Sequence, residues 1–186
     1  MSPFHLMPKF RELENNLTDS YLELKKAIFS SETFWLRQSH DPVTQQPTED
    51  YMWFSHPIIA RPLPPETPYS VVRSSLTDLC TKVLVEILLH NNIKIECFHR
   101  ICINLLTQQP EPRESEVHID HSFDYRHIII YLDDSDGDTI MYNSKHRIVD
   151  RSSPEEDKVI LFGKCQHSGE FPIKHPKRTI LVATFS

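Results

Sequence analysis

Glycine is scarce in this chain, which contains only Gly137, Gly163 and Gly169 among its 186 residues. A loop that cradles a phosphate group needs several glycines within one short stretch. The sequence therefore disfavours nucleotide-binding folds of the Walker and Rossmann types. All three glycines lie in the last third of the chain, and because glycine permits tight backbone conformations, this third is the first candidate for a functional site.

An excess of positive charge and a long apolar run are missing as well. The 20 basic and 26 acidic residues give a formal net charge of −6, which disfavours binding to the nucleic-acid backbone. The longest apolar run, Val83–Leu89, is interrupted by Glu86 and is far shorter than a membrane span. Residues 1–16 show no basic stretch followed by an apolar one. We expect a cytoplasmic protein without a nucleic-acid or membrane partner.

The four cysteines show no CxxC spacing, and nothing indicates an oxidising compartment in which they would pair. We expect buried free thiols at Cys80, Cys97, Cys102 and Cys165.

The composition is that of a globular protein. Hydrophobic residues make up 39% and charged residues 25% of the chain, which excludes disorder as a general description. A length of 186 residues favours a single domain over residues 1–186. We expect a helical support and connector over residues 1–95 and a β-rich core over residues 96–186.

Two amphipathic helices are predicted in the first half. Apolar residues recur every three or four positions over residues 10–28 and again over residues 69–87. Ser20 and Glu23 have the spacing of a capping box, and two asparagines at 91–92 end the second helix.

The segment between the helices, residues 31–68, is rich in aromatic residues and proline. Proline removes backbone donors, so we expect a packed connector without regular structure. Its aromatic side chains either line a substrate entrance or fill the core between helices and sheet; they are Phe34, Trp35, Tyr51, Trp53 and Phe54.

After Lys94 the sequence consists of short β-rich runs separated by turns. The eight predicted strands are 97–106, 116–120, 126–133, 138–142, 146–150, 158–162, 165–168 and 178–185. This spacing predicts a mainly β, α+β protein with a double-stranded β-helix, or jelly-roll, core and the N-terminal helices packed on one sheet. The acidic turn 133–138 is interpreted as a hairpin tip, because it lacks the glutamate of an EF-hand loop.

A metal site is indicated by three residues. His118 and Asp120 are two apart on a predicted strand, so both side chains project to the same side. His167 follows 47 residues after Asp120. Two histidines and one carboxylate form the facial triad that binds Fe(II) and leaves three positions open. The same donors also bind catalytic zinc, so the metal stays open on this pattern alone.

An anion site is indicated by Arg178. It lies eleven residues after His167 in the apolar run 177–182, and a buried arginine requires an anionic partner.

With these residues in order, the sequence resembles the 2-oxoglutarate- and Fe(II)-dependent dioxygenases, in particular the small viral and bacterial members of the prolyl-4-hydroxylase-like branch. The resemblance covers residues 100–185 well and the helical half more loosely. It is carried by His118-Ile119-Asp120, Ile129-Tyr131-Leu132, Asp134, Gly137-Asp138-Thr139, Val159–Phe162, His167-Ser168-Gly169 and Lys177-Arg178.

The resemblance implies Fe(II), 2-oxoglutarate and dioxygen as cofactor and cosubstrates. His118, Asp120 and His167 would be the metal ligands and the catalytic residues, and Arg178 would bind the distal carboxylate of 2-oxoglutarate, which a guanidinium fork suits. Asn104 is a further candidate contact to this molecule. The carboxylate of Asp120 argues against the halogenating variants of the family, which have a small residue there.

The sequence departs from the family pattern at two points. Leu106 and Ile130 occupy the positions where a tyrosine often contacts the cosubstrate, and Tyr131 is then expected to point to the opposite face. Ile180 replaces a hydroxyl residue often found two positions after the arginine. Beyond the metal motif, a loop is predicted at His121, Tyr125 and Arg126, whose side chains either face a substrate or, as is more common in such loops, are solvated.

Three functions follow from these patterns. The first is a hydroxylase that oxidises a C–H bond and converts 2-oxoglutarate to succinate. Its substrate is a small molecule or a peptidyl residue, with a prolyl or peptidyl residue favoured, while a free amino acid and a nucleobase stay open. The second is a non-catalytic jelly-roll binding or assembly module, and the third is a zinc hydrolase, for which no suitably spaced second carboxylate is evident.

Overall fold

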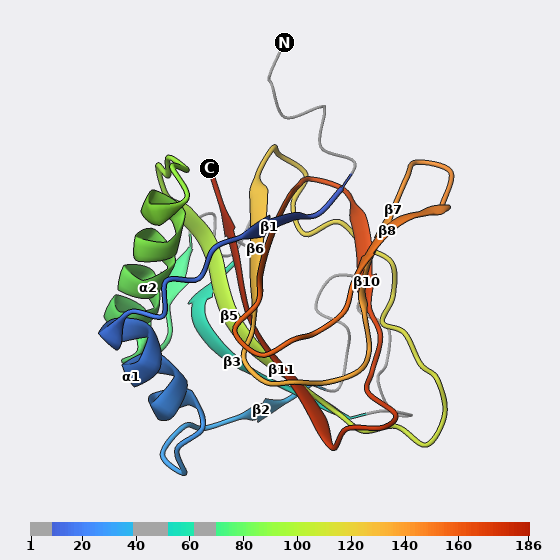
Figure 1. Cartoon of the computed structure of the whole chain (residues 1–186), viewed down its shortest axis with the longest axis horizontal. Helices are drawn as coiled ribbons and strands as arrows, with labels where there is room; N and C mark the ends of the chain where they lie inside the picture. Colours follow the sequence, from blue (N-terminus) through green and yellow to red (C-terminus); the bar gives the residue numbers. More distant parts are fainter. Residues whose placement is uncertain (1–8, 39–51, 62–69) are drawn as a thin grey trace.

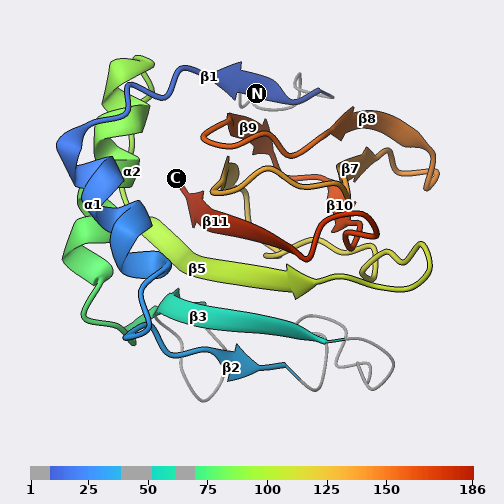
Figure 2. The same ribbon diagram turned by 60° about the horizontal axis from the view of Figure 1, so that its bottom comes forward.

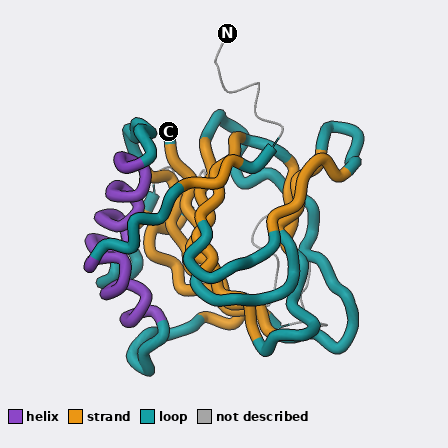
Figure 3. The backbone as a smooth tube through the Cα atoms, viewed as in Figure 1, coloured by secondary structure: helices purple, strands orange, loops and turns teal. Residues whose placement is uncertain are grey.

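The computed structural model describes residues 9–38, 52–61 and 70–186. Its elements in chain order are β1 (Arg11–Leu13), α1 (Asp19–Ile28), β2 (Leu36–Arg37), β3 (Trp53–Ala60), β4 (Val71–Val72), α2 (Thr77–His90), β5 (Phe98–Thr107), β6 (Arg126–Tyr131), β7 (Thr139–Tyr142), β8 (Ile148–Ser152), β9 (Val159–Gly163), β10 (Gln166–Gly169) and β11 (Lys177–Phe185). Both helices cover the outer face of a large sheet, and a smaller sheet lies on the side away from them (Figure 1, Figure 2). Figure 3 shows the same division between the helical layer and the strand core.

The strands form the predicted double-stranded β-helix. The large sheet has the order β1-β9-β6-β11-β5-β3-β2, with β4 paired to β3, and the small sheet has the order β10-β7-β8. Seven of the eight predicted runs correspond to strands. The run 116–120 contains only a β-bridge between His118 and His167, which places it beside β10 where a fourth strand of the small sheet would lie.

The predicted helix over residues 10–28 is only partly correct. Residues 11–13 form β1, which pairs with β9 at the edge of the large sheet. The helix α1 begins after Leu17, whose φ of 45° is incompatible with a right-handed helix. The N-cap is Thr18, whose hydroxyl accepts a hydrogen bond from a first-turn N–H, so the predicted capping box at Ser20 is wrong.

The irregular connector predicted over residues 31–68 is also wrong in its described part. Here β2 pairs with β3, and β3 pairs with β5 along most of its length. Proline is tolerated because the register shifts between Pro57 and Ile59, as expected where a strand lacks an N–H donor. Tyr51 lies outside the described residues.

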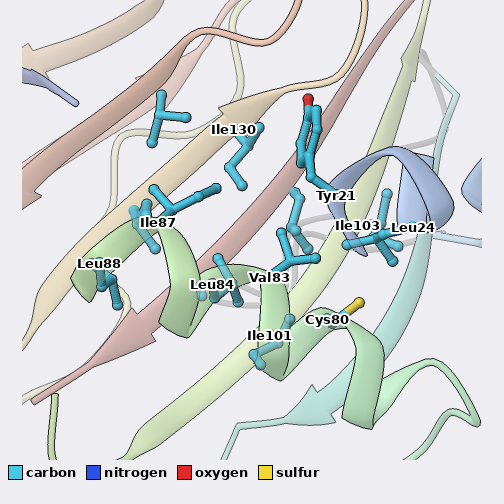
Figure 4. Packing of buried hydrophobic residues seen from close by; sticks show 14 of the residues in the cluster. Tyr21, Leu24, Cys80, Val83, Leu84, Ile87, Leu88, Ile101, Ile103 and Ile130 are labelled. Atoms are coloured by element: carbon cyan, nitrogen blue, oxygen red, sulfur yellow. The ribbon is translucent and has the colours of Figure 1, made fainter. Parts of the chain in front are cut away.

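The second helix is shorter than predicted, because residues 71–72 form β4 and α2 begins at Thr77. Its C-cap is Asn91, as predicted. One side of α2 packs flat on the large sheet (Figure 4). The buried side chains of this layer include Cys80, Val83, Leu84, Ile87 and Leu88 from α2 and Ile101, Ile103 and Ile130 from the sheet. Full burial of a large apolar side chain contributes roughly 1.5–3 kcal/mol to the stability of the fold. Packing of the helices therefore stabilises the large sheet of the barrel.

Side chains on the two faces of β6 belong to two different hydrophobic clusters. Ile128 and Ile130 belong to the helix-facing core, whereas Ile129 and Tyr131 belong to a second cluster inside the barrel. The prediction that Tyr131 points away from the interior is therefore wrong. The sequence period gives the alternation of side chains but not which face is the inner one.

All four cysteines are free thiols, but the prediction that they are buried holds only for Cys80 and Cys102, since Cys165 is partly buried and Cys97 is exposed.

The acidic segment 133–138 is not the predicted hairpin tip, because it connects β6 of the large sheet to β7 of the small sheet. It is a structural anchor. Asp136 accepts hydrogen bonds from the N–H groups of Ile173, Lys174 and His175 at 2.9–3.2 Å.

Within the described ranges, neither helix is long and apolar enough to cross a membrane.

Candidate metal centre and adjoining cavity

The structure brings His118, Asp120 and His167 together. One donor atom from each lies within 4.8 Å of the others, and the two imidazole centroids are 4.5 Å apart. The β-bridge fixes this approach, since the N–H groups of His118 and His167 each donate to the carbonyl of the other at 3.0 Å. These are the three residues that the sequence predicts as metal ligands.

Both imidazoles are oriented by backbone carbonyls. Nδ1–H of His118 donates to the carbonyl of Glu116 at 2.8 Å, and Nδ1–H of His167 donates to the carbonyl of Cys165 at 3.1 Å. In each ring Nε2 is then free to donate its lone pair to a metal. Burial, reinforced by repulsion from His118, lowers the pKa of His167 to about 4, which keeps this ring neutral at physiological pH.

Asp120 is held as a carboxylate by two arginines. Its Oδ1 accepts hydrogen bonds from Arg61 at 2.7 Å and from Arg100 at 3.2 Å, and its backbone N–H donates to the Tyr125 hydroxyl at 3.0 Å. Burial acts to raise the pKa of Asp120, but the positive charge of Arg100, together with that of Arg61, outweighs it and the pKa is well below its ordinary value.

The second oxygen of this carboxylate fits a metal ligand. Oδ2 of Asp120 is buried without a hydrogen-bond partner among the described residues, and it lies 3.7 Å from Nε2 of His167. An unsatisfied buried carboxylate oxygen is energetically costly. The Nε2 atoms of two imidazoles and this oxygen are the donor set that Fe(II) accepts on one face, so the residues present fit a divalent metal ion.

Arg178 lies in a cavity of about 100 Å³ that also reaches His118. Its side chain is 1% exposed, and it donates to the Thr139 hydroxyl at 2.6 Å and to the carbonyl of Glu170 at 3.4 Å. Its Nε has no partner, and no carboxylate in the described part of the chain pairs with the guanidinium. A buried, permanently charged group in this state requires an external anion.

The hydroxyl group beside Arg178 comes from Thr139, since position 180 is an isoleucine. Besides accepting from Arg178, its hydroxyl accepts from the Tyr131 hydroxyl at 2.8 Å. Tyr131 also donates toward the carbonyl of Ser152 at 3.0 Å. Sequence reasoning missed this pair because Thr139 lies on β7 of the small sheet, and only the sheet packing brings it to Arg178.

The remaining cavity residues come from the large sheet and the adjoining loops. Asn104 lines the cavity, as its predicted role requires, and its Oδ1 accepts from the Cys102 thiol at 3.3 Å. Of the aromatic residues in the connector, Trp53 lines the cavity whereas Trp35 packs against the helix-facing core. Trp53 is thus placed as expected for lining an entrance, and Trp35 is placed as expected for core packing.

The loop after Asp120 faces inward more than predicted. His121 is buried, and its Nε2 lies 2.8 Å from the Thr184 hydroxyl. Tyr125 is buried beneath the Asp120 backbone. Arg126 lines a separate, larger groove. None of these three residues lines the cavity that holds Arg178.

His127 is a further residue of the site that sequence motifs do not predict. It is buried inside the barrel, with Nε2 3.4 Å from Oδ2 of Asp120. Neither ring nitrogen has a hydrogen-bond partner among the described residues. Burial lowers its pKa well below the ordinary value, although Asp120 acts in the opposite direction. The ring is therefore a neutral group beside the carboxylate that is the candidate metal ligand.

Comparison with solved structures identifies proteins of the same fold. An oxidoreductase of the 2OG-Fe(II) oxygenase family from Burkholderia pseudomallei matches with a TM-score of 0.62 and 13% identity over 90% of this chain and 79% of that one. A Trichoplax adhaerens prolyl hydroxylase, in complex with a hypoxia inducible factor peptide, matches with a TM-score of 0.58 and 12% identity over 95% and 82%. A Pseudomonas putida prolyl-4-hydroxylase matches with a TM-score of 0.55 and 14% identity over 95% and 91%.

The chain matches no protein-family model and no curated protein sequence. At identities of 12–14% the structural likeness establishes the fold. It confirms, at the level of the fold, the resemblance to 2-oxoglutarate- and Fe(II)-dependent oxygenases that the sequence motifs indicate.

Proposed function

We propose that this chain, which has the fold of the 2-oxoglutarate- and Fe(II)-dependent oxygenases, is a dioxygenase that hydroxylates a C–H bond. The proposal rests on one cavity, which contains a buried arginine without an anion and adjoins a carboxylate oxygen without a hydrogen-bond partner. Arg178 is buried there without a carboxylate partner, and the His118–Asp120–His167 group beside it has an unsatisfied carboxylate oxygen. A metal ion chelated by 2-oxoglutarate meets both requirements at once.

The metal would be held by Nε2 of His118 and His167 and by Oδ2 of Asp120. Bound Fe(II) supplies the redox chemistry that couples oxidative decarboxylation of 2-oxoglutarate to succinate with C–H hydroxylation by dioxygen. Burial keeps His167 neutral, and the Nδ1–H bonds to backbone carbonyls orient Nε2 of both histidines for metal binding. The two arginines on Oδ1 keep Asp120 ionised and leave Oδ2 directed away from them.

The cosubstrate would be positioned by Arg178. Its guanidinium is held by Thr139 and the carbonyl of Glu170, so it can bind a carboxylate without first losing rotamer freedom. Asn104 offers a polar contact along the same cavity, and Ile129 and Phe171 supply apolar walls that exclude water.

We favour a prolyl or peptidyl residue as the substrate. This choice is supported by two of the structural neighbours, which are prolyl hydroxylases, one of them in complex with a peptide. The net charge of −6 disfavours nucleic acid.

The two other functions are less well supported. A zinc hydrolase needs a general base near the metal-bound water, and no Asp or Glu is found among the described residues that line the cavity. A non-catalytic module gives no reason to keep an unpaired buried guanidinium, which costs folding free energy.

Anaerobic thermal unfolding with Mn(II) in place of Fe(II), with and without 2-oxoglutarate, tests the proposal. A ligand at about one hundred times its dissociation constant stabilises the folded state by roughly 2.7 kcal/mol. We expect this stabilisation by 2-oxoglutarate to require Mn(II) and to disappear in Arg178→Gln. The matched control is Arg151→Gln, because Arg151 is a half-exposed arginine that already pairs with Asp138 and Glu170.

Aerobic assays with Fe(II) complete the test, with succinate as the product measured. Succinate formation that needs both Fe(II) and 2-oxoglutarate supports the dioxygenase. Wild-type protein that binds neither Mn(II) nor 2-oxoglutarate would leave the non-catalytic module as the better description.

A further inference from the structure

The carboxylate of Asp120 is paired with more positive charge than it can balance. Arg61, which directly follows β3, donates through Nη2 to Oδ1 and through Nη1 to the backbone carbonyl of Asp120. Arg100 of β5 donates through Nη1 to the same Oδ1. Two guanidinium groups therefore share one oxygen atom.

These arginines face the cavity, whereas their carboxylate lies behind them. Arg61 and Arg100 both line the cavity together with His118. Their side chains are 13% and 12% exposed, and that of Asp120 is 1% exposed. Each guanidinium has several N–H donors, and only three from the pair are donated to Asp120.

The charges of this group do not balance. Two guanidinium groups, each permanently charged, contact a single carboxylate. Asp120 thus compensates one of the two arginines.

Binding of the metal ion and 2-oxoglutarate would not remove this excess of positive charge. The two positive charges of a divalent metal are balanced by the two negative charges of 2-oxoglutarate. Arg61, Arg100 and Arg178 then remain against the single negative charge of Asp120 among the described residues of the site. A further anion is favoured by this surplus.

Arg100 and Arg178 are attached to the large sheet at different levels of the barrel. In the pairing of β11 with β5, Arg178 lies opposite Leu106, whereas Arg100 lies opposite Thr184. Six residues along a strand span about 20 Å. Arg178 and the arginine pair therefore mark two ends of the site, with the metal ligands joined to the pair through Asp120.

We propose that Arg61 and Arg100 form a second anion-binding site next to the metal centre, and that the molecule to be hydroxylated carries a carboxylate or phosphate group that binds there. This inference rests on the proposed function, because it assigns 2-oxoglutarate to Arg178. It narrows the substrate to an anionic small molecule or to a peptide that presents an anionic group close to the reacting carbon.

Paramagnetic relaxation by Mn(II) tests the proposal without knowledge of the substrate. The protein is saturated with Mn(II) and 2-oxoglutarate, and the relaxation of added inorganic phosphate (³¹P) and of ¹³C-labelled acetate and acetamide is measured. Acetamide is the neutral match for acetate. Even weak binding within reach of Mn(II) accelerates relaxation, so low affinity does not hide the site.

We expect acetate or phosphate to relax faster than acetamide by about tenfold, since a charge-assisted hydrogen bond contributes roughly 1.5–3 kcal/mol. The effect should fall in Arg61→Gln and in Arg100→Gln, and Arg61→Lys should recover part of it. The anion with the larger effect identifies carboxylate or phosphate as the preferred group.

Two results would overturn the proposal. One is equal relaxation of acetate and acetamide in the wild type, a comparison that depends on no variant. The other is an anion effect unchanged in both glutamine variants, which would mean direct coordination to the metal. Binding of Mn(II) and 2-oxoglutarate is measured in the same samples by electron paramagnetic resonance and calorimetry, so failure of the proposed function appears separately as failure of those two ligands to bind.

Discussion

Gly169 and Arg178 are fitted to each other: a Cβ atom on residue 169 would lie 2.8 Å from Nη1 of Arg178. Because Gly169 of β10 has no side chain, the guanidinium can occupy its position on the cavity wall. Gly169 would thus serve the proposed anion site, and His167, two residues before it, would serve the proposed metal site.

Gly169→Ala should weaken 2-oxoglutarate binding while leaving Mn(II) binding intact. The new methyl group displaces the buried guanidinium from Thr139 and from the bound carboxylate, and we expect a loss of about tenfold or more in affinity. Calorimetric titration of the Mn(II)-loaded protein measures it. Gly163→Ala, at the end of β9, is the matched control, and equal losses in both variants would contradict the fit described here.

Thr139→Val should also reduce the affinity for 2-oxoglutarate. Valine keeps the shape but removes the oxygen that accepts from Arg178 and from Tyr131, leaving two buried donors without this partner. Such a loss costs roughly 1–3 kcal/mol. Thr139→Ser keeps the hydroxyl and should bind like the wild type; an equal loss in the serine variant would assign the effect to the methyl group.

Asp120→Asn should destabilise the metal-free protein as well as abolish metal binding. The substitution leaves Arg61 and Arg100 buried without their counter-charge, and removal of one member of a buried ion pair costs about 3–5 kcal/mol. Urea unfolding in the presence of a chelator measures this cost. His118→Gln removes a metal ligand without removing charge, so it should lose the metal with a much smaller change in stability. Similar stabilities for the two variants would argue against the arginine pair as a buried charge.

Asp136 should make the stability of the protein sensitive to acid. Burial raises its pKa, but the N–H groups of Ile173 and His175 and the His175 side chain outweigh this and leave the pKa far below the ordinary value. A carboxyl group with a depressed pKa stabilises the folded state fully above its unfolded pKa of about 3.9, and this contribution is lost as the pH falls below that value. Asp136→Asn should therefore be less stable than the wild type at pH 7, with a difference that shrinks toward pH 3. Urea unfolding at both pH values tests this, and a constant difference would contradict it.

The sequence predicts the barrel and the grouping of the candidate metal ligands better than it predicts their surroundings. Spacing alone places His118, Asp120 and Arg178, since each depends on alternation along one strand or on a short distance in the chain. Arg61 was not predictable in this way, because it follows β3, and the proline-rich sequence around β3 indicates no strand.

Thr139 and Tyr131 show a second limit. Alternation along β6 gives two faces, but only the packing of α2 against Ile130 determines which of them is outside. Once that is fixed, Tyr131 points inward to Thr139. These positions depend on contacts between segments far apart in the sequence, which no local pattern records.

The proposed metal ion would join two segments that few backbone pairs hold together. Among the described residues, the isolated β-bridges of this region are His118–His167 and Glu114–Glu170, so segment 116–120 has fewer pairs with β10 than a full strand would have. A metal ion bound to His118, Asp120 and His167 would act as a cross-link that closes a long chain loop containing β6 to β9, much as a disulfide does. Under the proposed function, bound iron would then stabilise the fold in addition to supporting turnover, and chelation should expose this segment to proteases before the helical face opens.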